Sequence, residues 1–286
     1  MRTLNSTDPL GPNAARQEAP HPHQAVLDPT GRFFVVNDLG TDTLLVLDSA
    51  DDQFEIVNRV RVTPDGCGPR HGVFLPRGTV EQATHYLLLC ELLSTLEVFS
   101  LEYADNNLRF VPTQVLSSFG QGAGPANAST ATAGEIILAS NNRDVYVSNR
   151  NTGNETDVLA HFRVLPASTD NDSPAPLSLE FAQSISSRGV HPRMLTLSRD
   201  EAMLFSTNQF AGEGLVALRR NGGGLEAPGA GFDVQADVGR VSAAVEAAGS
   251  LVDAPVAAVG VDVFGEGEAG PLFVLQLPDV EVPAAA

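Results

Sequence analysis

The sequence contains no lysine and no tryptophan, and only two of its 286 residues are cysteine. All 17 basic residues are therefore arginine, which removes Schiff-base catalysis and a P-loop lysine from consideration. Because positive charge is scarce in this chain, any place where several arginines meet is a candidate for function.

The two cysteines, Cys67 and Cys90, are too few for a disulfide framework. They are predicted to be reduced thiols packed in the core, as in a cytosolic protein. No stretch approaches the roughly 18 consecutive apolar residues of a membrane span. Residues 1–16 are polar and lack the apolar segment of a signal peptide, so a cytoplasmic location is expected.

Acidic residues outnumber basic ones, 35 to 17, and the formal net charge is −18. A surface of that sign disfavours nucleic acid and anionic membranes as partners. The hydrophobic fraction of 43% is that of a soluble globular protein. The expected partner is thus a small molecule, and the sequence leaves the oligomeric state open.

A repeated pattern organises the chain: a proline-centred tetrad opens an apolar run, a turn follows, and a second apolar run ends in a polar pair. The tetrads are His21-Pro22-His23-Gln24, Gly68-Pro69-Arg70-His71 and His191-Pro192-Arg193-Met194, and a fourth copy without a tetrad begins at Glu135. The copies lie about 45 to 65 residues apart, within or just above the period of propeller blades.

Each copy is expected to form four antiparallel strands, which is the blade of a β-propeller. In the first copy these strands are predicted at residues 24–28, 32–37, 43–48 and 54–62. The predicted fold is therefore all-β, with about four to five blades. Residues 1–20 are predicted to be an irregular lead-in, residues 21–234 the blades, and residues 235–286 an irregular closing blade or tail. Within that tail, strands are predicted at 240–245, 257–263 and 271–277, with a helix at 241–248 as the alternative.

In an antiparallel blade, the start of the first strand and the end of the second lie at one edge. A ring of blades would gather these edges around one channel, although the residues are far apart in sequence. The tetrads place His23, Arg70, His71 and Arg193 there. The strand ends place four different residue types at one repeated position, namely Asp38, Glu91, Arg150 and Gln209, with Asn149 beside Arg150.

Differing residues at one repeated position suggest a shared site whose parts have separate roles. The guanidinium group of arginine binds carboxylate or phosphate groups through two parallel hydrogen bonds and can stabilise an oxyanion. Histidine and carboxylate side chains transfer protons. The pattern therefore indicates a small anionic substrate and general acid–base chemistry.

Structural explanations compete with this interpretation. Arg193 could form a salt bridge at a blade edge, and His71 could simply bond to backbone. The spacing of His21 and His23 is compatible with a metal-ligand pair, but nothing completes a metal site, so no metal or cofactor is expected. The run Gly222-Gly223-Gly224 lacks a strand-to-helix setting and is predicted to be a loop.

Several short segments of the chain, taken in order, carry a resemblance to a known family. The first are Gly11-Pro12-Asn13 and the stretch from His21 to Gly31, and the last is His191-Pro192-Arg193. Between them lie Gly68-Pro69-Arg70-His71, Cys90-Glu91-Leu92 with Ser94-Thr95, and Tyr146-to-Arg150. With these segments the chain resembles the seven-bladed β-propeller lactonases, a family that includes propeller-type 6-phosphogluconolactonases and fungal carboxy-cis,cis-muconate cyclases. The resemblance covers about residues 11–220 and implies that N-terminal blades of the family pattern are absent from this chain.

The resemblance implies a lactone-handling pocket on one face, without a required metal. It implies catalytic roles for His23, Arg70, Arg150 and Glu91. The leading hypothesis is a hydrolase that acts on a sugar-acid lactone such as 6-phosphogluconolactone, with Glu91 or His23 as the general base. The alternatives are a cyclase that closes carboxymuconate to its lactone, and a catalytically silent propeller arc that only binds.

Overall fold

A computed structural model describes residues 8–50, 53–79, 81–104, 106–121, 124–168 and 176–227. The chain divides into two compact units, residues 1–232 and 233–286, and all described residues belong to the first. The strands and the alternative helix predicted beyond residue 240 lie outside the described residues. Within the described part, no helix is long and apolar enough to cross a membrane.

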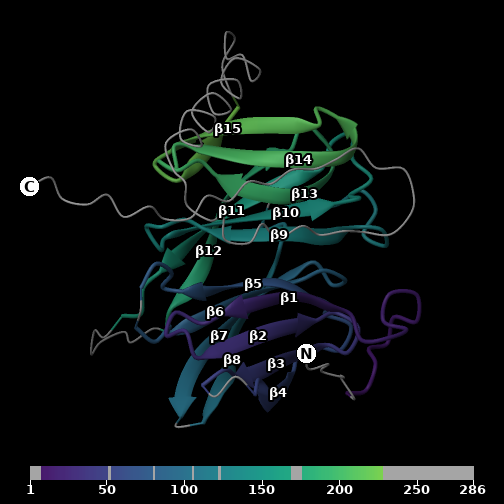
Figure 1. Ribbon diagram of the computed structural model, residues 1–286. Helices are drawn as coiled ribbons and strands as arrows, with labels where there is room; N and C mark the ends of the chain where they lie inside the picture. Colours follow the sequence, from purple (N-terminus) through teal and green to yellow (C-terminus); the bar gives the residue numbers. More distant parts are fainter. Residues whose placement is uncertain are drawn as a thin grey trace, which may run out of the picture. The chain divides into compact units, whose positions relative to one another are not determined.

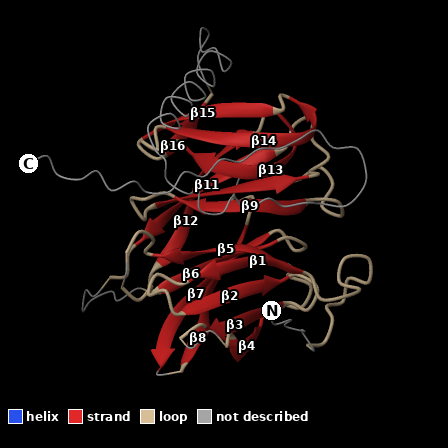
Figure 2. Ribbon diagram, in the orientation of Figure 1, coloured by secondary structure: helices blue, strands red, loops and turns tan. Residues whose placement is uncertain are grey.

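The described residues form 16 strands in four antiparallel sheets of four strands each, and within each sheet the strands follow chain order (Figures 1 and 2). The first sheet contains β1 (Pro22–Leu27), β2 (Phe33–Asp38), β3 (Thr43–Asp48) and β4 (Glu55–Arg61). The second contains β5 (Pro69–Leu75), β6 (His85–Cys90), β7 (Thr95–Ala104) and β8 (Asn107–Ser117). The third contains β9 (Thr132–Leu138), β10 (Asp144–Arg150), β11 (Val158–Leu165) and β12 (Ser178–Ser186). The fourth contains β13 (Gly189–Leu197), β14 (Met203–Gly212), β15 (Leu215–Asn221) and β16 (Gly224–Glu226). The prediction of four-stranded propeller blades is confirmed.

The first strands of successive blades lie next to each other. Strand β1 contacts β5, β5 contacts β9, and β9 contacts β13. Within the described residues the contacts run from the first blade to the fourth without closing a ring. The predicted incomplete propeller of four to five blades is thus present with four described blades.

Hydrophobic clusters fill the three spaces between neighbouring blades. Strand β6 contributes to two of them, because Tyr86 and Leu88 face the first blade while Leu87 and Leu89 face the third. All four of these side chains are fully buried. The continuous apolar run in this strand therefore reflects burial on both faces, as expected for a sheet between two neighbours.

Cys67 and Cys90 form a disulfide bond, with their Cα atoms 4.9 Å apart. The prediction of two free thiols was wrong, because the turn into β5 brings Cys67 beside the end of β6. The backbone shows the same approach: Glu91 N donates to Gly68 O, and Leu92 N donates to Cys67 O. The crosslink therefore joins the start of the Arg70 strand to the residue that precedes Glu91.

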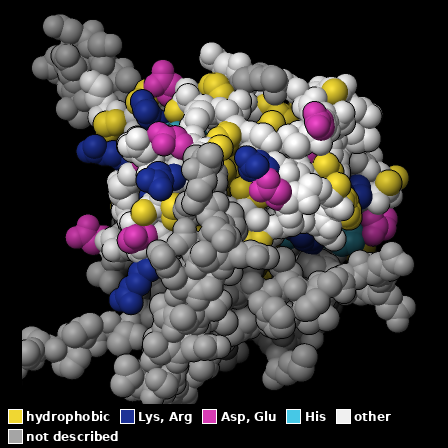
Figure 3. All heavy atoms as spheres, turned by 90° about the horizontal axis from the view of Figure 1, so that it is seen from above, with side chains coloured by type: hydrophobic (Ala, Val, Ile, Leu, Met, Phe, Trp, Pro, Cys, Tyr) yellow, Lys and Arg dark blue, Asp and Glu magenta, His cyan; other side chains and the backbone are white. Residues whose placement is uncertain are grey.

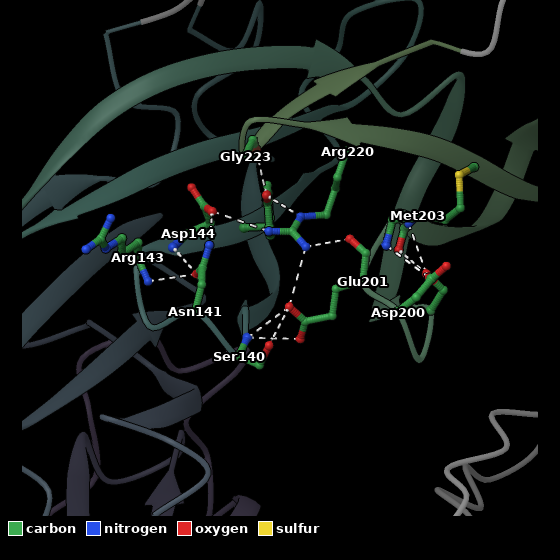
Figure 4. A network of polar contacts seen from close by, with 12 residues as sticks. Ser140, Asn141, Arg143, Asp144, Asp200, Glu201, Met203, Arg220 and Gly223 are labelled. Atoms are coloured by element: carbon green, nitrogen blue, oxygen red, sulfur yellow. Dashed lines mark hydrogen bonds and ion pairs between the residues drawn. The ribbon is translucent and has the colours of Figure 1, made fainter.

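A buried polar network joins the third blade to the fourth (Figure 4). Arg220 of β15 donates from Nε to Tyr146 Oη at 2.7 Å, and its Nη2 lies 3.3 Å from Asp144 Oδ2. Its Nη1 donates to the backbone oxygen of Glu201 at 2.5 Å. The Glu201 carboxylate in turn accepts from Ser140 N and Oγ. One nearly buried guanidinium thus connects groups from both blades.

Replacing Arg220 with Leu is expected to lower the free energy of unfolding by about 3–5 kcal/mol, because Asp144 loses a buried cationic partner. Urea denaturation followed by circular dichroism measures this change. The control, Arg219→Leu, removes an exposed arginine from the same strand and should change stability by less than about 0.5 kcal/mol. Equal losses in the two variants would contradict a role for this network in joining the blades.

Candidate active site

Glu91 lies at the centre of a cluster of arginines that come from different parts of the chain. It directly follows β6, and its side chain is 1% exposed. One carboxylate oxygen accepts from Arg70 Nη1 at 2.7 Å and lies 3.1 Å from Arg150 Nη2. The other accepts from Arg16 Nη2 at 2.5 Å. A single buried carboxylate therefore holds three guanidinium groups together.

The charges of this cluster decide the ionisation of Glu91. Burial opposes ionisation, but Arg70, Arg150 and Arg16 outweigh it and lower the Glu91 pKa to about 2. Burial and neighbouring Arg70 lower the pKa of Arg150 to about 10, so it also stays charged at neutral pH. The cluster consequently carries an excess of positive charge.

Arg70 of β5 is oriented by further bonds to the two neighbouring inner strands, β9 and β1. Its Nε donates to Gly134 O at 2.7 Å, and its Nη1 lies 2.5 Å from His23 Nε2. His23 accepts this bond, so its proton belongs on Nδ1. Burial, and then the charge of Arg70, lower the His23 pKa to about 2, which keeps the ring neutral.

Arg150, the last residue of β10, passes close to the backbone of β9. Its Nη2 donates to Ala133 O at 2.9 Å, and its Nη1 lies 3.3 Å from His191 Nε2. A Cβ atom on Gly134 would lie 2.5 Å from Ser148 Oγ and 3.2 Å from Arg150 Cδ. Glycine at position 134 therefore leaves the space that this arginine needs.

Two buried donors in this cluster have no acceptor among the described residues, namely Arg150 Nε and His23 Nδ1. Buried donors normally have a partner, because an unpaired one loses its hydrogen bond to water. An excess of positive charge of this kind is the environment that binds oxygen-rich anions in proteins.

His71 follows Arg70 on β5 and pairs with Glu135 of β9. Its Nδ1 lies 2.6 Å from Glu135 Oε1, and both side chains are nearly buried. The rings of His71 and His23 are in edge contact, with centroids 4.8 Å apart. The pair therefore adjoins the arginine cluster.

Arg193 of β13 belongs to the same region. Its charge lowers the pKa of His23 and contributes to the lowered pKa values of Arg150 and His191. For His191 the largest cause is burial, and the result is a pKa of about 4. The predicted residues Glu91, His23, Arg70, Arg150, His71 and Arg193 thus lie together.

Three other predicted residues lie outside this cluster. Asp38 is buried at the end of β2 and accepts from His21 N and Gly40 N, so it holds a turn. Asn149 is buried and exchanges hydrogen bonds with Ser118. Gln209 of β14 is exposed, and no described contact connects it to the arginines. Only two of the four strand-end positions, Glu91 and Arg150, therefore contribute to the cluster.

Three further residues take part in the cluster without having been predicted as site residues: Arg16, Glu135 and His191. Glu135 had a usable signal, because it occupies the repeat position that His71 and Gln24 occupy in other blades. His191 begins one of the tetrads. Arg16 lies in the predicted irregular lead-in and had no signal. It is held there because neighbouring Gln17 is buried and donates to Leu39 O and Asp42 Oδ1.

A view onto one face shows arginine and acidic side chains interspersed, with hydrophobic side chains scattered between them (Figure 3). Charges of both signs mixed in this way produce no strong field of one sign. The arginines around Glu91 differ from this face in that positive charges outnumber negative ones there.

Residues 2–238 match the family model described as lactonase, 7-bladed β-propeller. A protein of Arthroderma benhamiae named as a probable 6-phosphogluconolactonase is 38% identical over 136 residues, which are 47% of this chain and 32% of that protein. An uncharacterised protein of Lactococcus lactis is 33% identical over 60% of this chain and 47% of its own length. The chain thus spans about a third to a half of the length of these relatives.

Solved structures show the same fold. A protein from Lactobacillus plantarum superposes with a TM-score of 0.63 at 24% identity, covering 80% of this chain and 60% of that one. A periplasmic gluconolactonase of Pseudomonas aeruginosa superposes with a TM-score of 0.57 at 26% identity, covering 73% of this chain and 53% of that one.

Replacing Glu91 with Gln is expected to lower the free energy of unfolding at pH 7 by about 3–5 kcal/mol, because three arginines lose their shared carboxylate. The wild-type carboxylate has a folded-state pKa of about 2 against an ordinary value of 4.5. The contribution of the ionised Glu91 carboxylate to the free energy of unfolding is therefore present above pH 4.5 and is lost as the pH falls towards 2. The difference between the two proteins should shrink over that window.

Urea denaturation at several pH values measures this difference. Glu213→Gln serves as the control, because Glu213 pairs with Arg188 at the surface. Its effect should stay below about 1 kcal/mol. A stability difference between the wild type and the Glu91→Gln variant that stays constant across the whole acid range would show that Glu91 is not the ionised centre of the cluster.

Proposed function

This chain belongs to the seven-bladed β-propeller lactonase family, and we propose that it hydrolyses a sugar-acid lactone that carries an anionic group, such as 6-phosphogluconolactone. The single observation that carries the proposal is the set of arginines around Glu91, which come from the lead-in, the second blade and the third blade. The names of the relatives from Arthroderma benhamiae and Pseudomonas aeruginosa support the same reaction class.

In this proposal the arginines have two tasks. Guanidinium forks bind a phosphate or carboxylate group and orient the lactone. A guanidinium N–H that points at the carbonyl oxygen also stabilises the oxyanion that forms when water attacks. Arg150 suits the second task, because its guanidinium belongs to the cluster and stays charged at neutral pH.

Glu91 has a structural task in this scheme. A carboxylate with a pKa of about 2 is a weak base at neutral pH. Its three ion pairs instead hold the guanidinium groups at fixed positions, so that they need not reorganise during the reaction. Glu91 is thus assigned to the ordering of the arginines rather than to proton transfer.

Replacing Arg150 with Lys is expected to lower kcat for lactone hydrolysis by about 10²–10³-fold, because the charge remains while the planar set of donors is lost. Proton release from 6-phosphogluconolactone and from gluconolactone, corrected for spontaneous hydrolysis, measures the rate. Arg219→Lys, on the exposed face of β15, is the matched control and should retain wild-type kcat.

The same proteins are to be assayed for closure of carboxymuconate, followed by loss of its conjugated absorbance. Closure without lactone hydrolysis would replace the proposed reaction by the cyclase reaction. Binding of 6-phosphogluconate in calorimetry without turnover of either substrate would leave a binding protein in place of an enzyme.

A further inference from the structure

The two residues predicted as general base, Glu91 and His23, have unsuitable environments. Glu91 is ion-paired with three arginines. His23 already uses its Nε2 atom to accept from Arg70. Burial and the Arg70 charge keep the pKa of His23 near 2, so it holds a proton poorly. An efficient general base at neutral pH needs a free lone pair and a pKa near the working pH.

His71 has such a lone pair. Glu135 Oε1 accepts both from the backbone N–H of Ile136 at 3.0 Å and from His71 Nδ1 at 2.6 Å. Because an ionised carboxylate only accepts hydrogen bonds, the proton of the neutral His71 ring lies on Nδ1. Its Nε2 atom is then unprotonated and able to take up a proton.

The Nε2 atom of His71 has no hydrogen-bond partner among the described residues, and it is not one of the fully enclosed polar atoms. The His71 side chain is 8% exposed, which restricts the contact with solvent to a small part of the ring. The ring lies against His23, which contacts Arg70 and through it Glu91. The His71 ring therefore adjoins the proposed lactone-binding arginines.

Glu135 itself is held firmly. It comes from the third blade, while His71 comes from the second, so the pair spans a blade interface. The backbone N–H of Glu135 donates to Ser148 Oγ at 2.9 Å, and its side chain is 7% exposed. A carboxylate fixed in this way sets the tautomer and the orientation of the imidazole.

We propose that His71 is the general base for the attacking water and that Glu135 positions the His71 ring. This assignment rests on the proposed lactonase function. His71 Nε2 takes a proton from water while the water oxygen bonds to the lactone carbonyl carbon and the C=O electron pair moves to the oxygen. The tetrahedral intermediate then collapses, the ring C–O bond breaks, and the His71 imidazolium returns the proton to the leaving alkoxide. The products are the free hydroxy acid and the unchanged protein.

The charged and titratable groups that face His71 are Glu135 from β9 and His23 from β1, with Arg70 next to it on β5. The Glu135 charge stabilises the imidazolium, whereas the Arg70 charge opposes it. Removing the Glu135 charge should therefore make protonation of the His71 ring less favourable. The acid limb of kcat/KM would then move to lower pH.

His71→Gln is expected to lower kcat about 10²–10⁴-fold. Glu135→Gln should lower kcat less and shift the acid limb of the pH profile downwards. The matched control is His161→Gln. His161 is also a buried histidine paired with a carboxylate, since its Nε2 lies 2.8 Å from Asp144 Oδ1, but it does not belong to the arginine cluster. The control should lower the melting temperature but leave the pH profile of kcat/KM unchanged.

The outcomes separate this inference from the proposed function. An active wild type together with an equally active His71→Gln variant overturns His71 as the base and leaves the lactonase proposal standing. An unshifted acid limb in Glu135→Gln overturns the positioning role of Glu135. A wild type that hydrolyses no lactone overturns the proposed function and the assignment that rests on it.

One measurement does not depend on whether the variants fold. Long-range ¹H–¹⁵N spectra of the wild-type protein report the tautomer of each histidine. The expected result for neutral His71 is a proton on Nδ1, and a proton on Nε2 would overturn the assignment.

Discussion

The buried carboxylate of Glu91 is the point on which the site depends. Two nearly buried guanidinium groups, those of Arg70 and Arg150, and the half-exposed one of Arg16 would repel one another without a shared anion. Glu91 provides that anion and is itself kept ionised by the arginines, so each partner stabilises the charged form of the others. Because Arg16, Arg70 and Arg150 come from different segments, this one residue also ties those segments together.

The surrounding fold keeps Glu91 and its partners in place. The Cys67–Cys90 disulfide joins the chain just before β5 to the residue that precedes Glu91. Asp42 of the first blade accepts from Gly66 N and Gly68 N in the same turn, and it also accepts from Gln17 of the lead-in. Gly68 has a φ of +63°, a conformation that glycine adopts without strain. The lead-in, the first blade and the second blade thus converge on the turn that delivers Arg70.

A second principle is the division of roles between equivalent repeat positions. Residues 24, 71 and 135 follow one another at the same place of the inner strand in three successive blades. Gln24 accepts from the backbone N–H of Gly72 in the next blade, whereas His71 meets the carboxylate of Glu135. The repeat therefore provides a position that faces the neighbouring blade, and the residue type decides whether the contact is structural or chemical.

The sequence by itself determined the blades, because apolar alternation and turn residues are local properties that recur with each repeat. It also determined that His23, Arg70, Glu91 and Arg150 belong to one edge of their strands. Only the tertiary structure decided which partners meet there: Arg16 from a segment without a repeat pattern, Glu135 across a blade interface, and Cys67 beside Cys90. It also removed Asp38, Asn149 and Gln209 from the cluster. The physical reason is that repeat position specifies the edge a residue occupies, whereas contacts between blades depend on side-chain direction and packing that no local pattern encodes.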